Sequence, residues 1–378
     1  MPDHTRPPEK RVTIYDVAVE ADVSPSTVSR AFSRPSRVNS ETAERVRQVA
    51  EQLGYRTNPL PRALSTSRTR MIALVIADIT NPVYAGIVRG AQETAMHDEY
   101  TTVLIDAQES DRVERAAIER TMSTVDGIVL ASSRMSDSAI RMFAKQRPVV
   151  VLNRAVADVP CVVTDNPRGV RRAAEHLGEL GHDHITYVAG PQASWPNGIR
   201  WRSLLEAGME LEIRVRQIGP FSPTIEGGER AAEELRARPA TAVLAFNDQM
   251  AIGLIRGLTR MGIDVPGEVS VVGFDNTLAA DIVTPGLTTV AAPFYAEGSA
   301  ATRHLLTMIE GAPGHTGRPM VLPVRLVVRH STAARDRNAG RPRQWVRQPP
   351  ALAARSSQQI TAAPSLAAAP KKLWTPGR

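Results

Sequence analysis

Polar side chains follow three apolar runs of the chain, close to the points where these runs end. Asn153, Asn247 and Asp275 each come within two residues of such an end. Their amide and carboxylate groups supply both donors and acceptors, Arg200 adds a fork of donors, and Phe221 adds an apolar face. Sugar hydroxyls need paired donors and acceptors together with a face on which the ring can stack. This set predicts binding of a polyhydroxylated small molecule if the fold brings the residues together.

The elements that must position these residues are strands that alternate with helices. Unbroken apolar runs separated by segments of helical periodicity are typical of parallel sheets covered on both faces. One sheet would need too many strands, so we predict an α/β core of two lobes, each a doubly wound parallel sheet. Such folds bind ligands at the carboxyl ends of their strands. The predicted strands are Met71–Ile76, Thr102–Ile105, Gly127–Leu130, Val149–Leu152, Ile185–Ala189, Ala242–Ala245 and Val269–Gly273, and the predicted helices include 83–97, 167–179, 226–237 and 249–261.

Two short helices joined by a tight turn are predicted between Val12 and Phe32. Ser24 can cap the second helix, and Pro25 suits its first turn. Asp22 occupies the turn, where a left-handed backbone is expected and Asp is tolerated less well than Gly. This arrangement is a helix-turn-helix, which places its second helix in the DNA major groove; the alternative is an ordinary helical hairpin. The apolar residues expected between the two helices are Ile14, Val17, Ala18, Ala21, Val23, Val28 and Phe32.

A third helix is predicted after Asn39 or Ser40, either of which can cap it, and Gly54 ends it. The segment Tyr55–Thr69 that follows is rich in Pro and Ser. Together with the helix-turn-helix, this segment resembles the N-terminal signature of the LacI/GalR family of bacterial transcription regulators, and the resemblance covers roughly residues 11–332. It implies a three-helix DNA-binding domain (11–57), a hinge that becomes helical only on operator DNA (58–69), and a ligand-binding and dimerisation core (70–332).

The resemblance also implies which residues contact DNA. Pro25, Ser26 and Arg30 match positions that face base edges, and an Arg can bond guanine bidentately. Leu64 matches a hinge leucine that wedges between two base pairs from the minor groove and bends the duplex. Pro61 departs from the small residues usual there. The alternatives are that Leu64 belongs to a simple linker and that the polar residues are solvated helix positions. Further expected phosphate contacts or caps are Thr13, Tyr15, Ser24, Thr27 and Ser29, with Asn58 and Arg62 in the hinge.

For the core, the resemblance implies the fold of periplasmic sugar-binding proteins, with a ligand cleft between lobes and chain crossings near 163–166, 290–293 and 324–327. Arg200 matches an Arg that holds a ligand hydroxyl or carboxylate, and Phe221 an aromatic that stacks on the ligand. Asn153 stands where the family usually has Asp. Tyr84 is a further candidate for the cleft wall. The alternatives are that Asn247 and Asp275 cap helices or turns, that Arg200 forms an ion pair, and that Phe221 only packs.

The charge of the chain is unevenly distributed. The net charge is +7, but residues 71–332 hold 25 Lys or Arg and 30 Asp or Glu, which gives net −5. Residues 1–70 are net +4 and residues 333–378 are net +8, so the N-terminal domain suits phosphates and the core does not. The tail lacks apolar periodicity and a leucine-rich helix; we therefore expect a disordered basic segment at 333–378 and a dimer.

Other kinds of site find little support. Cys161, the only cysteine, lies in an apolar run that predicts a buried thiol in a strand, so disulfides and cysteine metal sites are not expected. His182 and His184 lie in a turn and are not expected to bind zinc. The sequence shows no phosphate loop, nucleophile elbow or metal-ligand cluster, so neither enzymatic activity nor a cofactor is expected.

The sequence therefore predicts a DNA-binding transcription regulator, a repressor, that binds a pseudo-palindromic operator as a homodimer. A small effector, a sugar or sugar derivative, is expected between the lobes. With no apolar secretion core at the N-terminus and no membrane-spanning run, we expect a cytoplasmic, nucleoid-associated protein. The alternatives are a ligand-binding receptor without DNA regulation, which the helix-turn-helix disfavours, and a sugar-processing enzyme, for which the sequence shows no set of catalytic residues.

Overall fold

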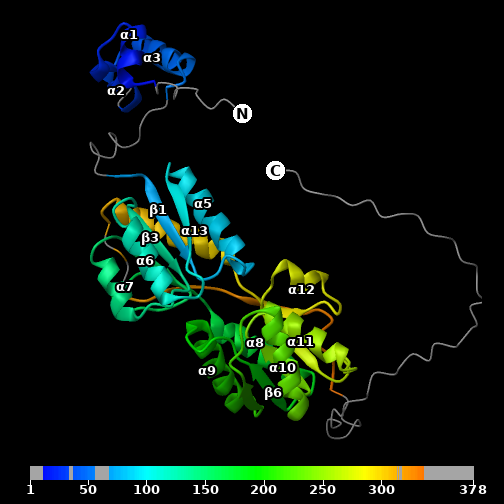
Figure 1. Ribbon diagram of the computed structural model, residues 1–378. Coiled ribbons are helices and arrows are strands. Elements are labelled where there is room, and N and C mark those ends of the chain that lie inside the picture. The colour runs from blue at the N-terminus through cyan, green and yellow to red at the C-terminus, as the bar shows by residue number, and fades with distance from the viewer. Residues whose placement is uncertain (1–11, 34–36, 56–67, 313, 315–316, 336–378) are drawn as a thin grey trace, which may run out of the picture.

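The first three helices of the chain pack into a small bundle. In the computed structural model, which describes residues 12–33, 37–55, 68–312, 314 and 317–335, these helices are α1 (Ile14–Glu20), α2 (Pro25–Ser33) and α3 (Ser40–Gln52) (Figure 1). Val17, Val28 and Val46 are fully buried between them. The apolar spacing predicted for the first two helices is thus confirmed, with Ala18 and Ala21 in the same core and Ile14, Val23 and Phe32 packed against it.

Local capping explains where the helices of the bundle begin and end. The Ser24 hydroxyl accepts a hydrogen bond from the Thr27 amide at 3.2 Å and thereby caps α2. Of the two candidate caps for α3, Asn39 is the one used, since its side chain accepts from the Glu41 amide at 2.9 Å. Asp22 has φ 51°, so the predicted left-handed turn is present without a glycine.

The rest of the described chain forms two six-stranded sheets with helices on their faces (Figure 1). The first sheet has the order β11-β5-β4-β3-β1-β2 and the second the order β12-β10-β9-β8-β6-β7. Neighbouring strands are parallel except that β12 pairs antiparallel with β10. The strands of the first lobe are β1 (Met71–Ile76), β2 (Thr101–Asp106), β3 (Gly127–Ala131), β4 (Val149–Leu152), β5 (Cys161–Thr164) and β11 (Met320–Leu322). Those of the second lobe are β6 (His184–Val188), β7 (Arg214–Ile218), β8 (Ala242–Ala245), β9 (Ser270–Asp275), β10 (Thr288–Ala291) and β12 (Arg325–Val327).

Helices separate these strands as the alternating pattern predicts. The first lobe carries α5 (Val83–His97), α6 (Asp111–Thr121), α7 (Asp137–Ala144) and α13 (Phe294–Ile309). The second lobe carries α8 (Asn166–Glu179), α9 (Trp195–Glu210), α10 (Ile225–Ala237), α11 (Asp248–Arg260) and α12 (Leu278–Ile282). No helix in the described part of the chain is long and apolar enough to cross a membrane.

The chain passes between the lobes three times. The crossings lie between β5 and α8, between β10 and α13, and between β11 and β12. The first two fall within the predicted ranges. The third lies at 323–324, close to the predicted 324–327. Residues 325–327 form β12 instead of the crossing. This strand was not recognised because three residues give too short an apolar pattern.

Two glycines fix how α13 packs against α5. A Cβ added at Gly298 would lie 2.0 Å from the Ile87 carbonyl oxygen, and one at Gly90 would lie 2.0 Å from that of Tyr295. Because backbone meets backbone at both points, neither helix can move away from the other without opening the core. The first turn of α13, which begins at Phe294 directly after the second crossing, is therefore held firmly beside the junction of the lobes.

The structure extends the core at both of its ends. Arg68 donates to the Ile309 carbonyl at 2.9 Å, and the Thr69 amide donates to Asp126 at 2.8 Å, so the last two residues of the predicted hinge are bonded to the first lobe. The Ala333 and Arg335 amides donate to Ser270 Oγ and the Leu180 carbonyl of the second lobe. The predicted tail thus begins three residues too early. Residues 336–378 and residues 56–67, which include most of the predicted hinge, lie outside the described residues.

Candidate functional site

A cleft lies where the carboxyl ends of the strands in both sheets face each other. Its narrow part has a volume of about 60 Å³ and opens beside a wider hollow of about 690 Å³; Glu109, Arg134 and Pro223 line both. Five of the six predicted ligand residues line the narrow part, and Phe221 lines the wider hollow. The five are Tyr84, Asn153, Arg200, Asn247 and Asp275. The structure therefore brings together residues that lie up to 191 positions apart in the sequence.

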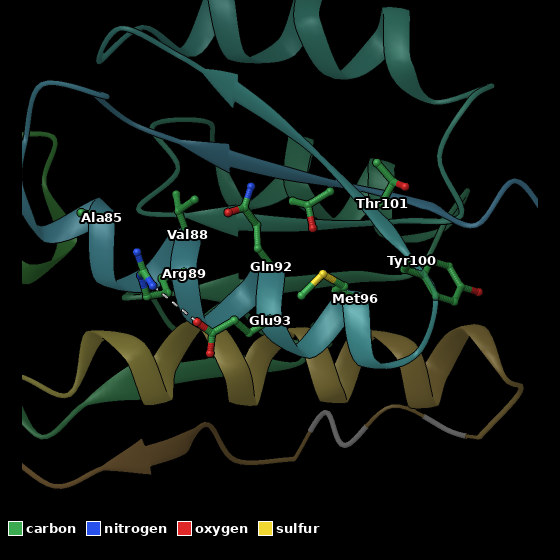
Figure 2. A pocket seen from close by; sticks show the side chains of 9 residues that line it. Ala85, Val88, Arg89, Gln92, Glu93, Met96, Tyr100 and Thr101 are labelled. Carbon is green, nitrogen blue, oxygen red and sulfur yellow. Dashed lines mark ion pairs between the residues drawn. The ribbon is translucent and has the colours of Figure 1, made fainter.

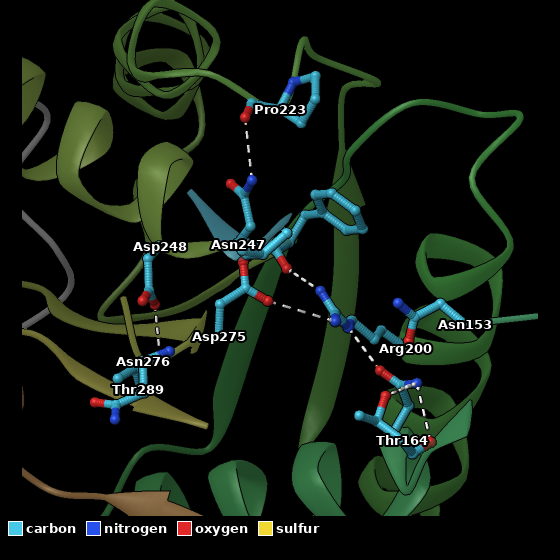
Figure 3. A network of polar contacts seen from close by, with 12 residues as sticks. Asn153, Thr164, Arg200, Pro223, Asn247, Asp248, Asp275, Asn276 and Thr289 are labelled. Atoms are coloured by element: carbon cyan, nitrogen blue, oxygen red, sulfur yellow. Dashed lines mark hydrogen bonds and ion pairs between the residues drawn. The ribbon is translucent and has the colours of Figure 1, made fainter. Parts of the chain in front are cut away.

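Arg200 is the centre of the polar contacts in the cleft (Figure 3). Its Nε donates to Asn166 Oδ1 at 2.8 Å, and its Nη1 donates to the Phe246 carbonyl. The guanidinium carbon lies 3.5 Å from the centroid of the Phe274 ring, which gives a close cation–π contact. Its Nη2 lies 3.8 Å from Asp275 Oδ1, and both side chains are buried. The predicted alternative, an ion pair, is present, and the same pair faces the cleft.

Asp275 has an environment that disfavours its charge. It ends β9 with φ 123°, a backbone conformation that few non-glycine residues adopt. Burial raises the pKa of its carboxyl well above the ordinary value; Arg200 opposes this rise, and the neighbouring charges of Asp248 and Glu297 add to it. Residues in strained backbone with such pKa shifts cluster at functional sites.

Asp248 belongs to the same polar network and has a structural role in it. Its carboxylate accepts from the Thr277 amide at 2.7 Å and from Thr289 Oγ1 at 2.5 Å, so it ties α11 to the segment after β9 and to β10 itself. Burial raises the pKa of Asp248 to about 6 despite these hydrogen bonds. Its oxygens are thus already used within the protein.

Asn247 caps α11, which was the alternative interpretation of this residue. Its Oδ1 accepts from the Met250 amide at 2.9 Å, and its Nδ2 donates to the Pro223 carbonyl at 3.0 Å (Figure 3). One amide proton of Asn247 remains for a ligand, and the two bonds fix the direction of that proton. On the opposite lobe, Asn153 follows β4 with φ 60°, and its Nδ2 lies 3.5 Å from Ser132 Oγ.

Several residues of the cleft were not identified from the sequence. Phe246 and Phe274 stack on Arg200, and Asn166 accepts its Nε proton. Phe274 is one of several apolar residues in β9, and Asn166 is a polar residue at the start of α8. Both residue types are common at such positions, so the sequence does not mark them as part of a site. Glu297 is fully buried in the first turn of α13, where the sequence indicates an exposed helix residue. No local pattern distinguishes any of these residues.

The candidate DNA-contacting residues of α1 and α2 lie at the surface of the bundle. Thr13, Tyr15, Ser24, Ser26, Ser29 and Arg30 are exposed, while Pro25 and Thr27 are half-buried. The Arg30 side chain bonds back to its own helix, through Nε to the Ser26 carbonyl at 3.1 Å and through Nη2 to Ser26 Oγ at 3.2 Å. Asn58, Arg62 and Leu64 lie outside the described residues.

A further hollow of about 600 Å³ lies along α5 and β2 and has no link to the predicted ligand residues. Figure 2 shows Arg89, Glu93 and Met96 of α5 beside Tyr100 at its far end. Arg89 and Glu93 form an ion pair at 3.7 Å, and the Met96 side chain is 71% exposed. The lining of this hollow is therefore partly apolar and partly charged.

The architecture defines a class of protein: a helix-turn-helix domain joined to a two-lobed core of the periplasmic-binding-protein type. Residues 13–58 match bacterial regulatory proteins of the lacI family, and residues 174–332 match the periplasmic binding protein-like domain. The chain is 31% identical over 336 residues to the HTH-type transcriptional repressor CytR of Escherichia coli K12, which covers 86% of this chain and 98% of the relative. It is 34% identical to the HTH-type transcriptional regulator DegA of Bacillus subtilis, over 85% and 98%.

Solved structures agree with this assignment. The Lac repressor dimer bound to operator and the anti-inducer ONPF matches with a TM-score of 0.78 and 26% identity, over 86% of this chain and 100% of that one. The complex of the transcriptional regulator CelR with cellobiose matches with a TM-score of 0.64 and 30% identity, over 85% and 100%. The chain belongs to the lacI family of bacterial regulatory proteins. It is a DNA-binding transcription regulator, as the sequence predicted.

Proposed function

We propose that this protein is a repressor that binds a pseudo-palindromic operator as a homodimer, and that a small polyhydroxylated effector in the cleft controls its affinity for DNA. The observation that carries the proposal is the convergence of Arg200, Asn247 and Asp275 in the cleft of a chain that begins with a helix-turn-helix. The similar structures named above hold operator DNA or a sugar, and a further regulator, from Enterococcus faecium, holds ribose.

The geometry of the cleft supports a set of proposed ligand contacts. Arg200 and the free proton of Asn247 would donate to ligand hydroxyls, and Asp275 and Asn153 would accept. Phe221 and Tyr84 would supply apolar walls of the two adjoining hollows. Because the narrow part is lined by both lobes, a ligand there would change how the lobes sit on each other.

The DNA contacts are proposed from the head and the hinge. Pro25, Ser26 and Arg30 would face base edges; Thr13, Tyr15, Ser24, Thr27 and Ser29 would contact phosphates or cap the helices. Asn58, Arg62 and Leu64 would contact the operator from the hinge, with Leu64 as the minor-groove wedge. The proposed domains are the head at 11–57, the hinge at 58–69, of which residues 68 and 69 also bond to the first lobe, the core from 70 to 335 and the tail from 336.

The dimer would cover apolar side chains that the single chain exposes. Leu278 and Ile282 of α12 are 79% and 73% exposed, and Met96 borders the groove in Figure 2. We propose that such a dimer acts in the cytoplasm at the nucleoid, without enzymatic activity.

Footprinting and analytical ultracentrifugation on a selected operator test the proposal together. We expect two protected half-sites related by a dyad and a complex with two chains per duplex, since one head contacts too few base pairs for useful specificity. A single protected half-site bound by one chain would contradict it.

A further inference from the structure

Glu297 is a buried carboxyl group for which the proposed function so far has no use. It is fully buried in the first turn of α13, where neither oxygen has a hydrogen bond of good geometry and the Asn153 side chain is only a marginal donor. Most buried polar groups in proteins have partners, and a buried carboxylate without them is costly. Burial raises the pKa of Glu297 to about 8, so the carboxyl is largely neutral at pH 7 in the free protein.

The position of Glu297 relates it to the cleft. Phe294, one turn earlier on α13, lines the narrow part of the cleft, and residues three apart lie on the same helix face. The Asn153 side chain, which also lines the cleft, favours the ionised form of Glu297, as does Arg200; the charge of Glu297 in turn disfavours that of Asp275. Gly298 packs this turn closely against α5, and the Glu297 side chain is fully buried there. The carboxyl thus adjoins the cleft wall formed by Asn153 and Phe294.

The charges of the residues that line the cleft also favour a positively charged ligand over a negatively charged one. Among its described lining residues, the carboxylates are Asp78, Glu109, Asp111 and Asp275, and the cations are Arg134 and Arg200. Arg134 is paired with Glu109 at 2.6 Å, and Arg200 is already held by Asn166 and the Phe246 carbonyl. An added negative group on the ligand would find few free donors, whereas a positive group would meet Asp275 and Glu297 in surroundings where charges interact strongly.

We propose that the effector is a polyhydroxylated molecule that carries a protonated amine, of the amino-sugar class, and that Glu297 and Asp275 are its counter-charges. This inference rests on the proposed function, because it assumes that the cleft is the effector site. Glu297 acts as a specificity-determining residue through the wall formed by Asn153 and Phe294. In the complex Glu297 and Asp275 are both ionised, and any proton that either carboxyl held in the free protein is released to solvent.

The test is calorimetric binding of matched pairs to the full-length protein at pH 7: D-glucosamine with D-glucose, D-galactosamine with D-galactose, and D-mannosamine with D-mannose. We expect at least one amine to bind about tenfold or more tightly than its neutral partner. Glu297→Gln, which keeps the shape and removes the charge, should reduce that preference to below about threefold and leave the neutral sugar within about threefold of wild type. Glu229→Gln is the matched control. Glu229 is a half-buried carboxylate of α10 that is paired with Arg260 at 2.9 Å and does not line the cleft.

The proton provides a second readout, which a purely structural role of Glu297 would not change. Between pH 6 and 7 the amines stay largely protonated, while Glu297 must lose its proton on binding; affinity should therefore rise with pH, by up to about tenfold per unit. Asp248 and Asp275 on the second lobe also have raised pKa values and add to the pH dependence. The rise of affinity with pH should therefore shrink, but not vanish, in Glu297→Gln, and it should persist in full in Glu229→Gln.

The outcomes separate this inference from the proposed function. If neutral sugars bind and no amine binds more tightly, or if Glu297→Gln keeps the full preference for the amine, the inference is wrong and the proposed function stands. If none of the six sugars binds, both the inference and the proposal of a sugar-class effector are wrong. Thermal unfolding of each variant, expected within a few degrees of wild type, shows that a loss of preference is not a loss of folding.

Discussion

Arg200→Ala is expected to lower the free energy of unfolding by about 3–5 kcal/mol and to abolish effector binding, because removal of one partner leaves a buried charge without compensation. Arg200 holds together elements that meet at the cleft: it bonds Asn166 of α8, and it stacks on Phe246 and Phe274 beside β8 and in β9. Without it, Asp275 would lie beside Asp248 and Glu297 with no cation in contact.

Urea denaturation and calorimetry measure the two effects of this variant. Arg202→Ala is the matched control, because Arg202 is an exposed residue two positions along the same helix, where a substitution should change stability by less than about 0.5 kcal/mol. If Arg200→Ala were as stable as Arg202→Ala and bound effector normally, Arg200 would not be the centre of the cleft network.

Arg30→Ala is expected to remove most of the preference for operator over random DNA. A bidentate contact to guanine contributes about 1–3 kcal/mol, and a dimer makes it in both half-sites, so the preference should fall by roughly 30-fold to 10⁴-fold. In the free protein the guanidinium bonds to Ser26 on the preceding turn of α2, which orders the side chain along the exposed face of the helix.

Competition binding with operator and random duplexes over a range of salt concentrations measures this loss. Weak, salt-dependent binding to both duplexes should remain, because phosphate contacts are independent of sequence. Arg47→Ala, which removes an exposed arginine of α3 paired with Glu44 at 2.9 Å, should keep a far larger preference for operator. A wild-type ratio of specific to random binding in Arg30→Ala would show that Arg30 does not contact bases.

Elements whose signal is local were predictable from the sequence. Met71–Ile76, Val149–Leu152, Ala242–Ala245 and 83–97 were predicted with the bounds found, because each is an apolar run or helical period with turn residues on both sides. The interior strand β10 (Thr288–Ala291) and three of the four edge strands were not predicted, whereas the edge strand β2 was predicted as Thr102–Ile105. Among the missed edge strands, β7 (Arg214–Ile218) carries charged residues on an exposed edge, and β11 and β12 are only three residues long. Their pairing depends on the neighbouring strand rather than on their own pattern.

The site residues that directly follow strands were predictable from the sequence. Asn153, Asn247 and Asp275 come together because the carboxyl ends of the strands in both lobes meet at the cleft. The stacking of Phe274 on Arg200 and the burial of Glu297 were not predictable, since they depend on contacts between residues 74 apart and on the close packing of α13 against α5. Tertiary packing, which the linear pattern does not contain, determines both.

The measurement that tests the account most directly is operator affinity of the full-length protein with and without a ligand shown by calorimetry to bind the cleft. We expect the ligand to change operator affinity by about 5–150-fold, and operator to change ligand affinity by the same factor, because linkage is reciprocal. Asp275→Asn should bind operator as wild type does and lose the ligand response. A ligand that binds wild type equally well with and without operator would contradict the claim that the cleft controls DNA binding.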